Sequence, residues 1–327
     1  MQKKVKKLVA QIRSIGDALE EAIALLEAGE VVAVPTETVY GLAADAANGA
    51  AVARIFEVKG RPRFNPLIAH VSTLAMAQKI ASFDPISLRL AEAFWPGPLT
   101  IVVPLRPDAA IHPLATAGLD TVALRMPLGF AAQLIERLGR PIAAPSANRS
   151  GSISPTTAEA VAEELGDRIR LVVDGGPAPI GVESTIVKVE GGAVRLLRPG
   201  GVTVEALEEL GLDVVRGGVG GIEAPGMMSS HYAPRAVLRL NATEVRPGEA
   251  LLAFGEWRAA NVGQAEAYRN LSEIGDVREA AANLFTYMKA LDRAGATTIA
   301  VEPIPFAGLG EAINDRLARA AAPRDEG

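Results

Sequence analysis

Hydrophobic and polar positions follow two alternating periods along the first two-thirds of the chain. Residues 14–28 repeat apolar side chains at helical spacing up to Gly29, whereas residues 31–34 form a short apolar run that stops at Pro35. The same alternation continues to about residue 201. It predicts an α/β fold with a twisted mixed sheet flanked by helices.

Further elements follow from the same periods. The pattern predicts helices at residues 50–58, two between 72 and 94 (the first capped by Ser72), 130–138 and 158–165. Thr156 and Glu159 have the spacing of a capping box for the last of these. The predicted strands are 67–71, 99–105, 121–126, 141–144 and 171–173, with a hairpin of 184–189 and 194–197. Residues 35–42 are predicted to form a polar loop at the end of a strand.

The rest of the chain predicts a linker and a second, smaller unit. Residues 202–240 are rich in Gly and Pro, so we expect three parts: 1–201, a linker and lid at 202–240, and 241–327. The last part is predicted to be a small Rossmann-like α/β domain. Its strands lie near 251–254 and 297–301, and its helices at 277–293 and after residue 310.

Composition narrows the class of protein. The chain has no cysteine, which excludes disulfides, thiolate metal sites and cysteine nucleophiles. Its three histidines lie far apart in sequence, which disfavours a built-in transition-metal site. The net charge of −5 disfavours a surface that binds nucleic acid or anionic lipid throughout. We see no secretion signal and no membrane-spanning run, and we expect a cytoplasmic protein.

The most suggestive chemistry lies between a predicted helix and a predicted strand. Lys59, Arg61 and Arg63 fall within five residues, with Gly and Pro between them. Because Gly and Pro interrupt a helix, we expect these three cations to project from a stiff connection, as a polyphosphate site requires. The alternative is a solvated basic turn.

Other candidate residues leave alternatives open. Ser146 lacks the context of a serine hydrolase nucleophile. Glu37 is either a general base, a helix cap or the partner of an arginine. Asp174 could either approach a metal–phosphate or belong to an ordinary turn. Arg125 and Arg198 could either pair with a carboxylate of the chain or bind an anionic ligand. Neither common phosphate loop is present, so the combination favours nucleotidyl or phosphoryl transfer by positioning and charge neutralisation.

Several motifs together resemble the YrdC-like threonylcarbamoyl-AMP synthases, in the order found in that family. They are PTETVYGL at 35–42, KGRP at 59–62, NPLI at 65–68, FWPGPLT at 94–100, PSAN at 145–148, SPT at 154–156, GVESTI at 181–186 and LRPG at 197–200. SHYAP at 230–234 resembles the linker of the longer, two-domain branch. The chain departs from the family at residues 128–130, where a histidine and a proline are frequent, and at 228–230, where basic or aromatic residues are frequent.

The resemblance implies an activity and a set of site residues. The family condenses L-threonine, bicarbonate and ATP with Mg²⁺ into threonylcarbamoyl-AMP and pyrophosphate, for the t6A modification of tRNA by a downstream transferase machinery. Carried over by motif, Lys59 and Arg61 would be catalytic. ATP would be held by Lys59, Arg61, Asn65, Thr121, Ser146, Asn148, Ser154, Arg198 and Tyr232. Threonine would be held by Thr38, His70, Arg125, Ser184 and the backbone of Ala144.

Two other functions stay open. One is a double-stranded RNA-binding module, because the family's concave basic face has that character and a weak RNA contact is conceivable. The other is a carbamoyltransferase maturation protein that shares the fold, although such proteins carry zinc-finger segments and this chain has no cysteine.

Overall fold

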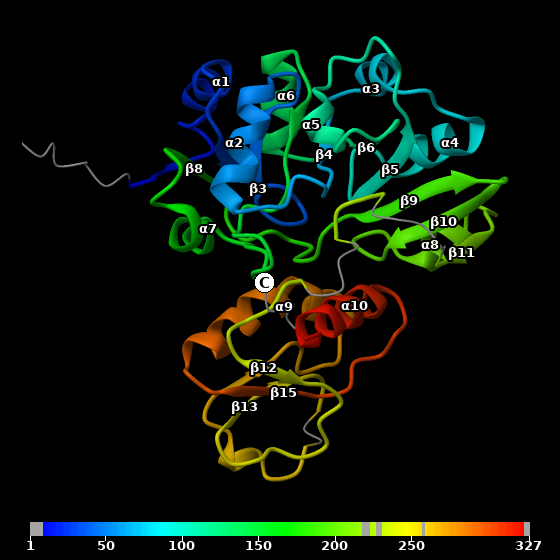
Figure 1. Ribbon diagram of the computed structural model, residues 1–327. Helices are drawn as coiled ribbons and strands as arrows, with labels where there is room; N and C mark the ends of the chain where they lie inside the picture. The colour runs from blue at the N-terminus through cyan, green and yellow to red at the C-terminus, as the bar shows by residue number, and fades with distance from the viewer. Residues whose placement is uncertain (1–8, 218–222, 227–230, 257–258, 324–327) are drawn as a thin grey trace, which may run out of the picture.

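The computed structural model describes residues 9–217, 223–226, 231–256 and 259–323, and it contains two sheets with separate cores. Within these residues, no helix combines the length and apolar character that a membrane span needs. Figure 1 shows the larger sheet with its helices in the upper part of the view and the smaller sheet below. The predicted α/β fold class, with a mixed sheet followed by a smaller α/β unit, is confirmed.

The larger sheet is mixed, with strand order β1-β8-β2-β3-β7-β4-β6-β5-β9-β10-β11 in the described residues. Its strands are β1 (Gln11–Ser14), β2 (Val32–Val34), β3 (Gly41–Asp45), β4 (Ile68–His70), β5 (Leu99–Pro104), β6 (Thr121–Arg125), β7 (Ile142–Ala143), β8 (Leu171–Asp174), β9 (Thr185–Glu190), β10 (Ala193–Arg198) and β11 (Val214–Arg216). β4 and β6 run parallel and pair His70 with Arg125. Both residues therefore lie at the same end of their strands, on the side of the sheet where β4 and β6 finish.

Helices cover the sheet and bring the basic stretch to this edge. They are α1 (Leu19–Glu27), α2 (Gly49–Lys59), α3 (Leu74–Ile80), α4 (Pro85–Phe94), α5 (Pro113–Thr116), α6 (Phe130–Leu138), α7 (Ala158–Leu165) and α8 (Val204–Glu208). α2 ends at Gly60, whose left-handed conformation (φ 61°) costs a glycine little and turns the chain toward β4.

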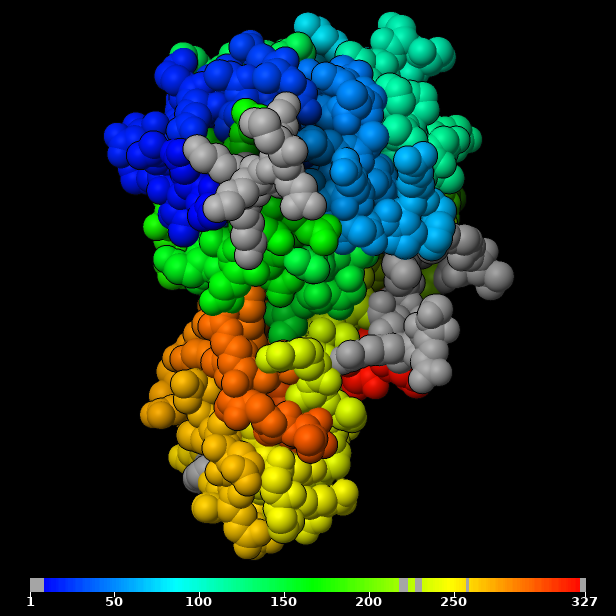
Figure 2. All heavy atoms as spheres, turned by 60° about the vertical axis from the view of Figure 1, so that its left-hand side comes forward, coloured from blue at the N-terminus to red at the C-terminus, as the bar shows by residue number. Residues whose placement is uncertain are grey.

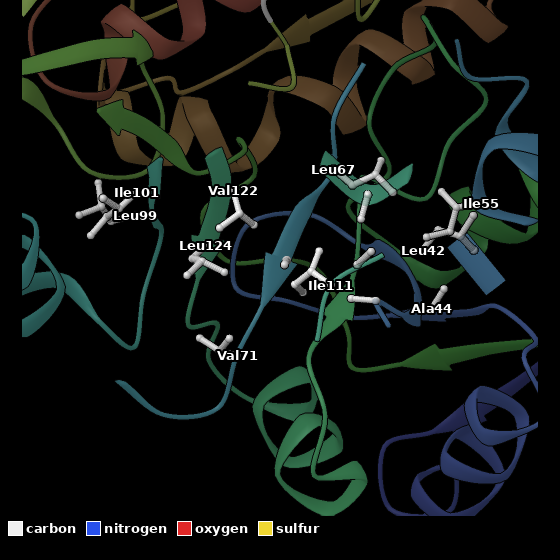
Figure 3. Close-up of a cluster of buried hydrophobic side chains, with 14 of the residues drawn as sticks. Leu42, Ala44, Ile55, Leu67, Val71, Leu99, Ile101, Ile111, Val122 and Leu124 are labelled. Atoms are coloured by element: carbon white, nitrogen blue, oxygen red, sulfur yellow. The ribbon is translucent and has the colours of Figure 1, made fainter. Parts of the chain in front are cut away.

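The core of this part consists mainly of small aliphatic side chains from the sheet and from the helices packed against it. Figure 3 shows some of them: Leu42 and Ala44 of β3, Ile55 of α2, Leu99 and Ile101 of β5, and Val122 and Leu124 of β6. Burying such aliphatic side chains stabilises the fold by about 25 cal/mol per Å² of apolar surface removed from water. The strands that carry the polar site residues are therefore held on a well-packed layer.

Several local predictions were wrong. Residues 11–14 form an edge strand, and the first helix begins only at Leu19. Residues 41–45 form β3, although residues 35–42 were expected to be loop. Two helix caps lie one residue later than predicted. Thr73 and Thr157 accept hydrogen bonds from backbone N–H groups three residues on, the spacing that an N-cap side chain reaches.

The smaller sheet is entirely parallel in the described residues, with order β12-β15-β13-β14. Its elements are β12 (Val237–Arg239), β13 (Glu249–Ala253), the 3₁₀ turn η1 (Val262–Gln264), β14 (Tyr268–Asn270), α9 (Val277–Arg293), β15 (Thr298–Val301) and α10 (Leu309–Ala321). Helices α9 and α10 lie between this sheet and the larger unit (Figure 1). In Figure 2, α9 (orange) packs beneath the green segment that contains α7.

Candidate functional site

A cavity of about 50 Å³ lies at the edge of the larger sheet where β4 and β6 end. Nine of the predicted site residues line it: Thr38, Arg61, His70, Arg125, Ala144, Ser146, Ser184, Arg198 and Tyr232. The lining also includes Glu183 and His231, to which the sequence assigned no role. Residues that are far apart in the chain are thus brought together.

Lys59 is buried beside this site and has a structural role. It is the last residue of α2, so the expectation that it projects from an irregular connection was wrong. Its Nζ atom donates to the backbone oxygens of Ser146 (2.5 Å) and Asn148 (2.6 Å). Burial, followed by the nearby charge of Arg61, lowers its pKa. The two hydrogen bonds from its Nζ atom fix the loop after β7.

Arg61 and Arg63 differ sharply in their surroundings. Arg61 is buried, and it donates to the backbone oxygens of Asn65 (3.2 Å) and Pro66 (2.9 Å). Burial lowers its pKa to about 10, which leaves the guanidinium charged at neutral pH. Arg63 is exposed, so the solvated-turn interpretation describes that residue alone.

Arg125 is enclosed by polar groups from the loop between β2 and β3. Its Nη2 atom forms an ion pair with Oε1 of Glu37 (2.7 Å), and its Nη1 atom donates to the hydroxyl of Thr38 (2.9 Å). Of the three roles considered for Glu37, the structure supports that of an arginine partner. The arginine is oriented before any ligand arrives, which favours binding of a carboxylate in one geometry.

His70 lies beside Arg125 and is buried. Burial, and next the charge of Arg125, lower the pKa of His70 to about 3. The imidazole is consequently neutral at physiological pH, and it can accept as well as donate a hydrogen bond.

A second cluster of polar residues surrounds Arg198 at the end of β10. Arg198 donates through Nη2 to the backbone oxygen of Ser184 (2.9 Å), whose hydroxyl lies 2.8 Å from that of Thr100. The adjacent Glu183 accepts a hydrogen bond from the hydroxyl of Ser154 (2.5 Å). Sequence reasoning missed Glu183 even though it lies inside the GVESTI motif; the available signal was a carboxylate directly before Ser184, a predicted ligand residue.

The far side of the cavity comes from the segment before β12. Tyr232 is buried, with φ of 63°, and its ring lies 4.0 Å from that of His231 between centroids. The predicted lid falls partly on residues 218–222 and 227–230, which lie outside the described residues. The same holds for the departure from the family pattern at residues 228–230.

Five predicted residues do not line the cavity. Three of them contact a residue of the lining. Lys59 and Asn148 bond to Ser146, and Ser154 bonds to Glu183. Asn65 contacts Arg61 through its backbone oxygen. Thr121 begins β6, at the opposite end from Arg125.

Two more candidates, Asp174 and Ser146, form local hydrogen bonds. Asp174 accepts the N–H of Gly176 (2.9 Å), as an ordinary turn requires. The hydroxyl of Ser146 donates to the side chain of Asn148 (2.6 Å). Among the described residues, no group of three or more His, Cys, Asp or Glu side chains could hold a metal ion.

Comparison with known proteins identifies similar chains. Residues 24–200 match the family model described as "Telomere recombination", and residues 202–322 match "Threonylcarbamoyl-AMP synthase, C-terminal domain". The chain is 41% identical to the threonylcarbamoyl-AMP synthase of Bacillus subtilis, over 94% of this chain and 93% of that protein. It is 42% identical to that of Pyrococcus abyssi, over 93% and 94%.

Solved structures show the same similarity. The crystal structure of P. abyssi Sua5 complexed with L-threonine aligns with a TM-score of 0.85 at 37% identity, covering 95% of this chain and 98% of that chain. A HypF structure aligns at 19% identity with a TM-score of 0.51, over 56% of this chain and 29% of that one. The latter likeness concerns the fold alone.

Proposed function

The chain belongs to the threonylcarbamoyl-AMP synthase family, and we propose that it makes L-threonylcarbamoyl-AMP and pyrophosphate from L-threonine, bicarbonate and ATP. The observation that carries the proposal is the cavity at the ends of β4 and β6. It combines three buried arginines with small hydroxyls and a neutral imidazole. Such a site binds anions and positions reactants without a nucleophile of its own.

Threonine binds, in this proposal, on the Arg125 side. The guanidinium pairs with the amino-acid carboxylate in competition with Glu37, its present partner. The hydroxyls of Thr38 and Ser184 face the substrate side chain, and the backbone of Ala144 and the neutral ring of His70 complete the pocket. The amine is left free to react.

ATP binds on the side of Arg61 and Arg198. Their charges neutralise phosphate oxygens, and Mg²⁺ arrives with the nucleotide as part of the substrate. Lys59 acts mainly by holding the loop of Ser146 and Asn148 in place. The remaining contacts are expected from Asn65, Thr121, Ser154 and Tyr232.

The reaction needs only positioning and charge neutralisation from these residues. The threonine amine attacks the carbon of bicarbonate or of CO2 derived from it, giving a carbamate with loss of water or a proton. A carbamate oxygen then attacks the α-phosphorus of ATP, and the bond to the β,γ-pyrophosphate breaks. Arg61 and Arg198 stabilise the negative charge that develops on the phosphates. The product would serve tRNA modification in the cytoplasm.

The decisive experiment measures pyrophosphate release by the full chain. We expect release that requires L-threonine and bicarbonate together, with threonylcarbamoyl-AMP identified by mass spectrometry. Release that is independent of either substrate would contradict the proposal. RNA binding measured without ATP over a range of salt concentrations tests the RNA-binding alternative, because such binding weakens steeply with salt.

A further inference from the structure

Arg316 of α10 crosses from the smaller unit to the candidate site. Its side chain is fully buried, and its Nε atom donates to Oε2 of Glu183 (2.8 Å). Its Nη1 atom donates to the backbone oxygen of Pro199 (2.9 Å) and to Asp315 (2.7 Å). An arginine at the interface between two domains thus holds one residue of the cavity lining, Glu183, and the backbone directly after another, Arg198.

The same guanidinium lies against an aromatic ring of the site. Its central carbon is 5.3 Å from the centroid of Tyr232, within the range of a cation–π contact. The ring of Tyr232 also stacks against Phe285 of α9, with ring centroids 5.6 Å apart. Tyr232 is therefore placed by α9 and α10 together, the two helices between the sheets in Figure 1.

Glu183 is the charged residue of the cavity lining that Arg316 contacts. Burial raises the pKa of this carboxyl, but the charges of Arg316 and Arg198 outweigh it and lower the pKa to about 2. The carboxylate is consequently ionised, and it holds the hydroxyl of Ser154. Without Arg316, a buried negative charge would face the place where the proposed triphosphate binds, and it would draw Arg198 away from the phosphates.

We propose that Arg316 is a positioning residue for the nucleotide: by neutralising and orienting Glu183, and by supporting Tyr232, the smaller domain completes the ATP site of the larger one. The inference rests on the proposed function, and it gives the smaller domain a defined task. Arg316 does not line the cavity, so its effect passes through Glu183 and Tyr232.

The test compares three variants of the full chain with the unmodified chain. Arg316→Met removes the charge and keeps most of the stem. The double variant Glu183→Gln/Arg316→Met also removes the carboxylate that the arginine neutralises. Arg293→Met is the matched control, because Arg293 of α9 pairs with Glu163 across the same domain boundary but is half exposed.

The readouts are the KM for ATP, the KM for L-threonine and kcat in pyrophosphate release, together with calorimetric binding of a non-hydrolysable ATP analogue. For Arg316→Met we expect the KM for ATP and the dissociation constant of the analogue to rise about tenfold or more, with a smaller change for threonine. The double variant should regain most of the loss, since no unpaired buried charge remains. Arg293→Met should match the unmodified chain.

Three outcomes would overturn the inference: unchanged ATP binding in Arg316→Met, an equal loss in Arg293→Met, or no recovery in the double variant. If Arg316→Met does not fold, Arg316→Lys replaces it. Lysine keeps the charge but cannot form the fork to Glu183 and Pro199, so the KM for ATP should be intermediate, and an unchanged KM would contradict the inference. Failure of the unmodified chain to release pyrophosphate would instead reject the proposed function.

Discussion

The guanidinium of Arg125 already holds a carboxylate, because its Nη2 atom lies 2.7 Å from Oε1 of Glu37 and both side chains are buried. From the residues alone, this arginine could either pair with a carboxylate or wait for an anion, and the family resemblance implied that it binds threonine. The ion pair means that the substrate must share the arginine with Glu37 or displace it. The two roles of Arg125, in stability and in binding, can therefore be separated by mutation.

Arg125→Met should lower both stability and threonine affinity. Removing one partner of a buried pair leaves an uncompensated charge, which costs about 3–5 kcal/mol of unfolding free energy. The double variant Glu37→Gln/Arg125→Met should recover most of that stability but none of the threonine affinity. Urea unfolding and calorimetric titration with L-threonine measure the two effects.

Arg137→Met is the control for this experiment, since Arg137 forms an exposed pair with Glu20 and should change stability by less than about 1 kcal/mol. Full threonine affinity in Arg125→Met would reject Arg125 as the carboxylate anchor.

Lys59 and Arg61 should give different defects. Lys59→Met breaks hydrogen bonds to the loop oxygens of Ser146 and Asn148, so it should reduce stability by about 1–3 kcal/mol as well as turnover. Arg61→Ala should mainly reduce turnover, by about 2–4 kcal/mol of transition-state stabilisation. Arg63→Ala, which alters an exposed cation, is the control. Pyrophosphate release at the unmodified rate in the first two variants would return this stretch to a structural role.

Long periodic segments were predictable, because their apolar faces coincide with the core. The expected bounds of the helices at residues 130–138 and 277–293 agree with α6 and α9, whose periodic apolar residues are buried. The hairpin of β9 and β10 was predictable from the glycine pair between its strands. Local sequence decides such elements.

The missed strands depend on distant partners. β1 pairs with β8, about 160 residues further along the chain, and all four of its residues are exposed. β11 lies within the expected linker but pairs with β10 of the larger sheet. Short strands with few buried side chains have no strong period of their own. The position of Glu183 within the site likewise depends on an arginine more than 130 residues away.

Threonine selectivity should depend on hydrogen bonding more than on size. The proposed pocket offers the hydroxyls of Thr38 and Ser184, and a site that bonds a substrate hydroxyl rejects analogues lacking it by about 10⁴-fold in favourable cases. Valine should therefore be a much poorer substrate than threonine, with serine intermediate. Competition assays of kcat/KM measure this directly. Comparable values for valine and threonine would reject the assignment of these two residues.

The two histidines of the cavity should make stability depend on pH. Burial lowers the pKa of His70 and of His231 to about 3, whereas an unfolded histidine titrates near 6.5. Between these values the unfolded chain binds up to two more protons than the folded chain. The free energy of unfolding should therefore decrease as the pH falls through this window, by up to about 1.4 kcal/mol per pH unit for each histidine.

A narrower window isolates this effect from the carboxylates. The pKa of Glu183 is lowered to about 2 in the folded protein. The stability that this ionised carboxylate adds to the fold is therefore lost only as the pH falls below about 4.5. Urea unfolding between about pH 4.5 and 6.5 should thus report mainly on the histidines. The variant His70→Asn/His231→Asn should show a shallower decline than the unmodified chain over that range, whatever its absolute stability. Parallel declines would mean that neither imidazole is held neutral by burial in the folded protein.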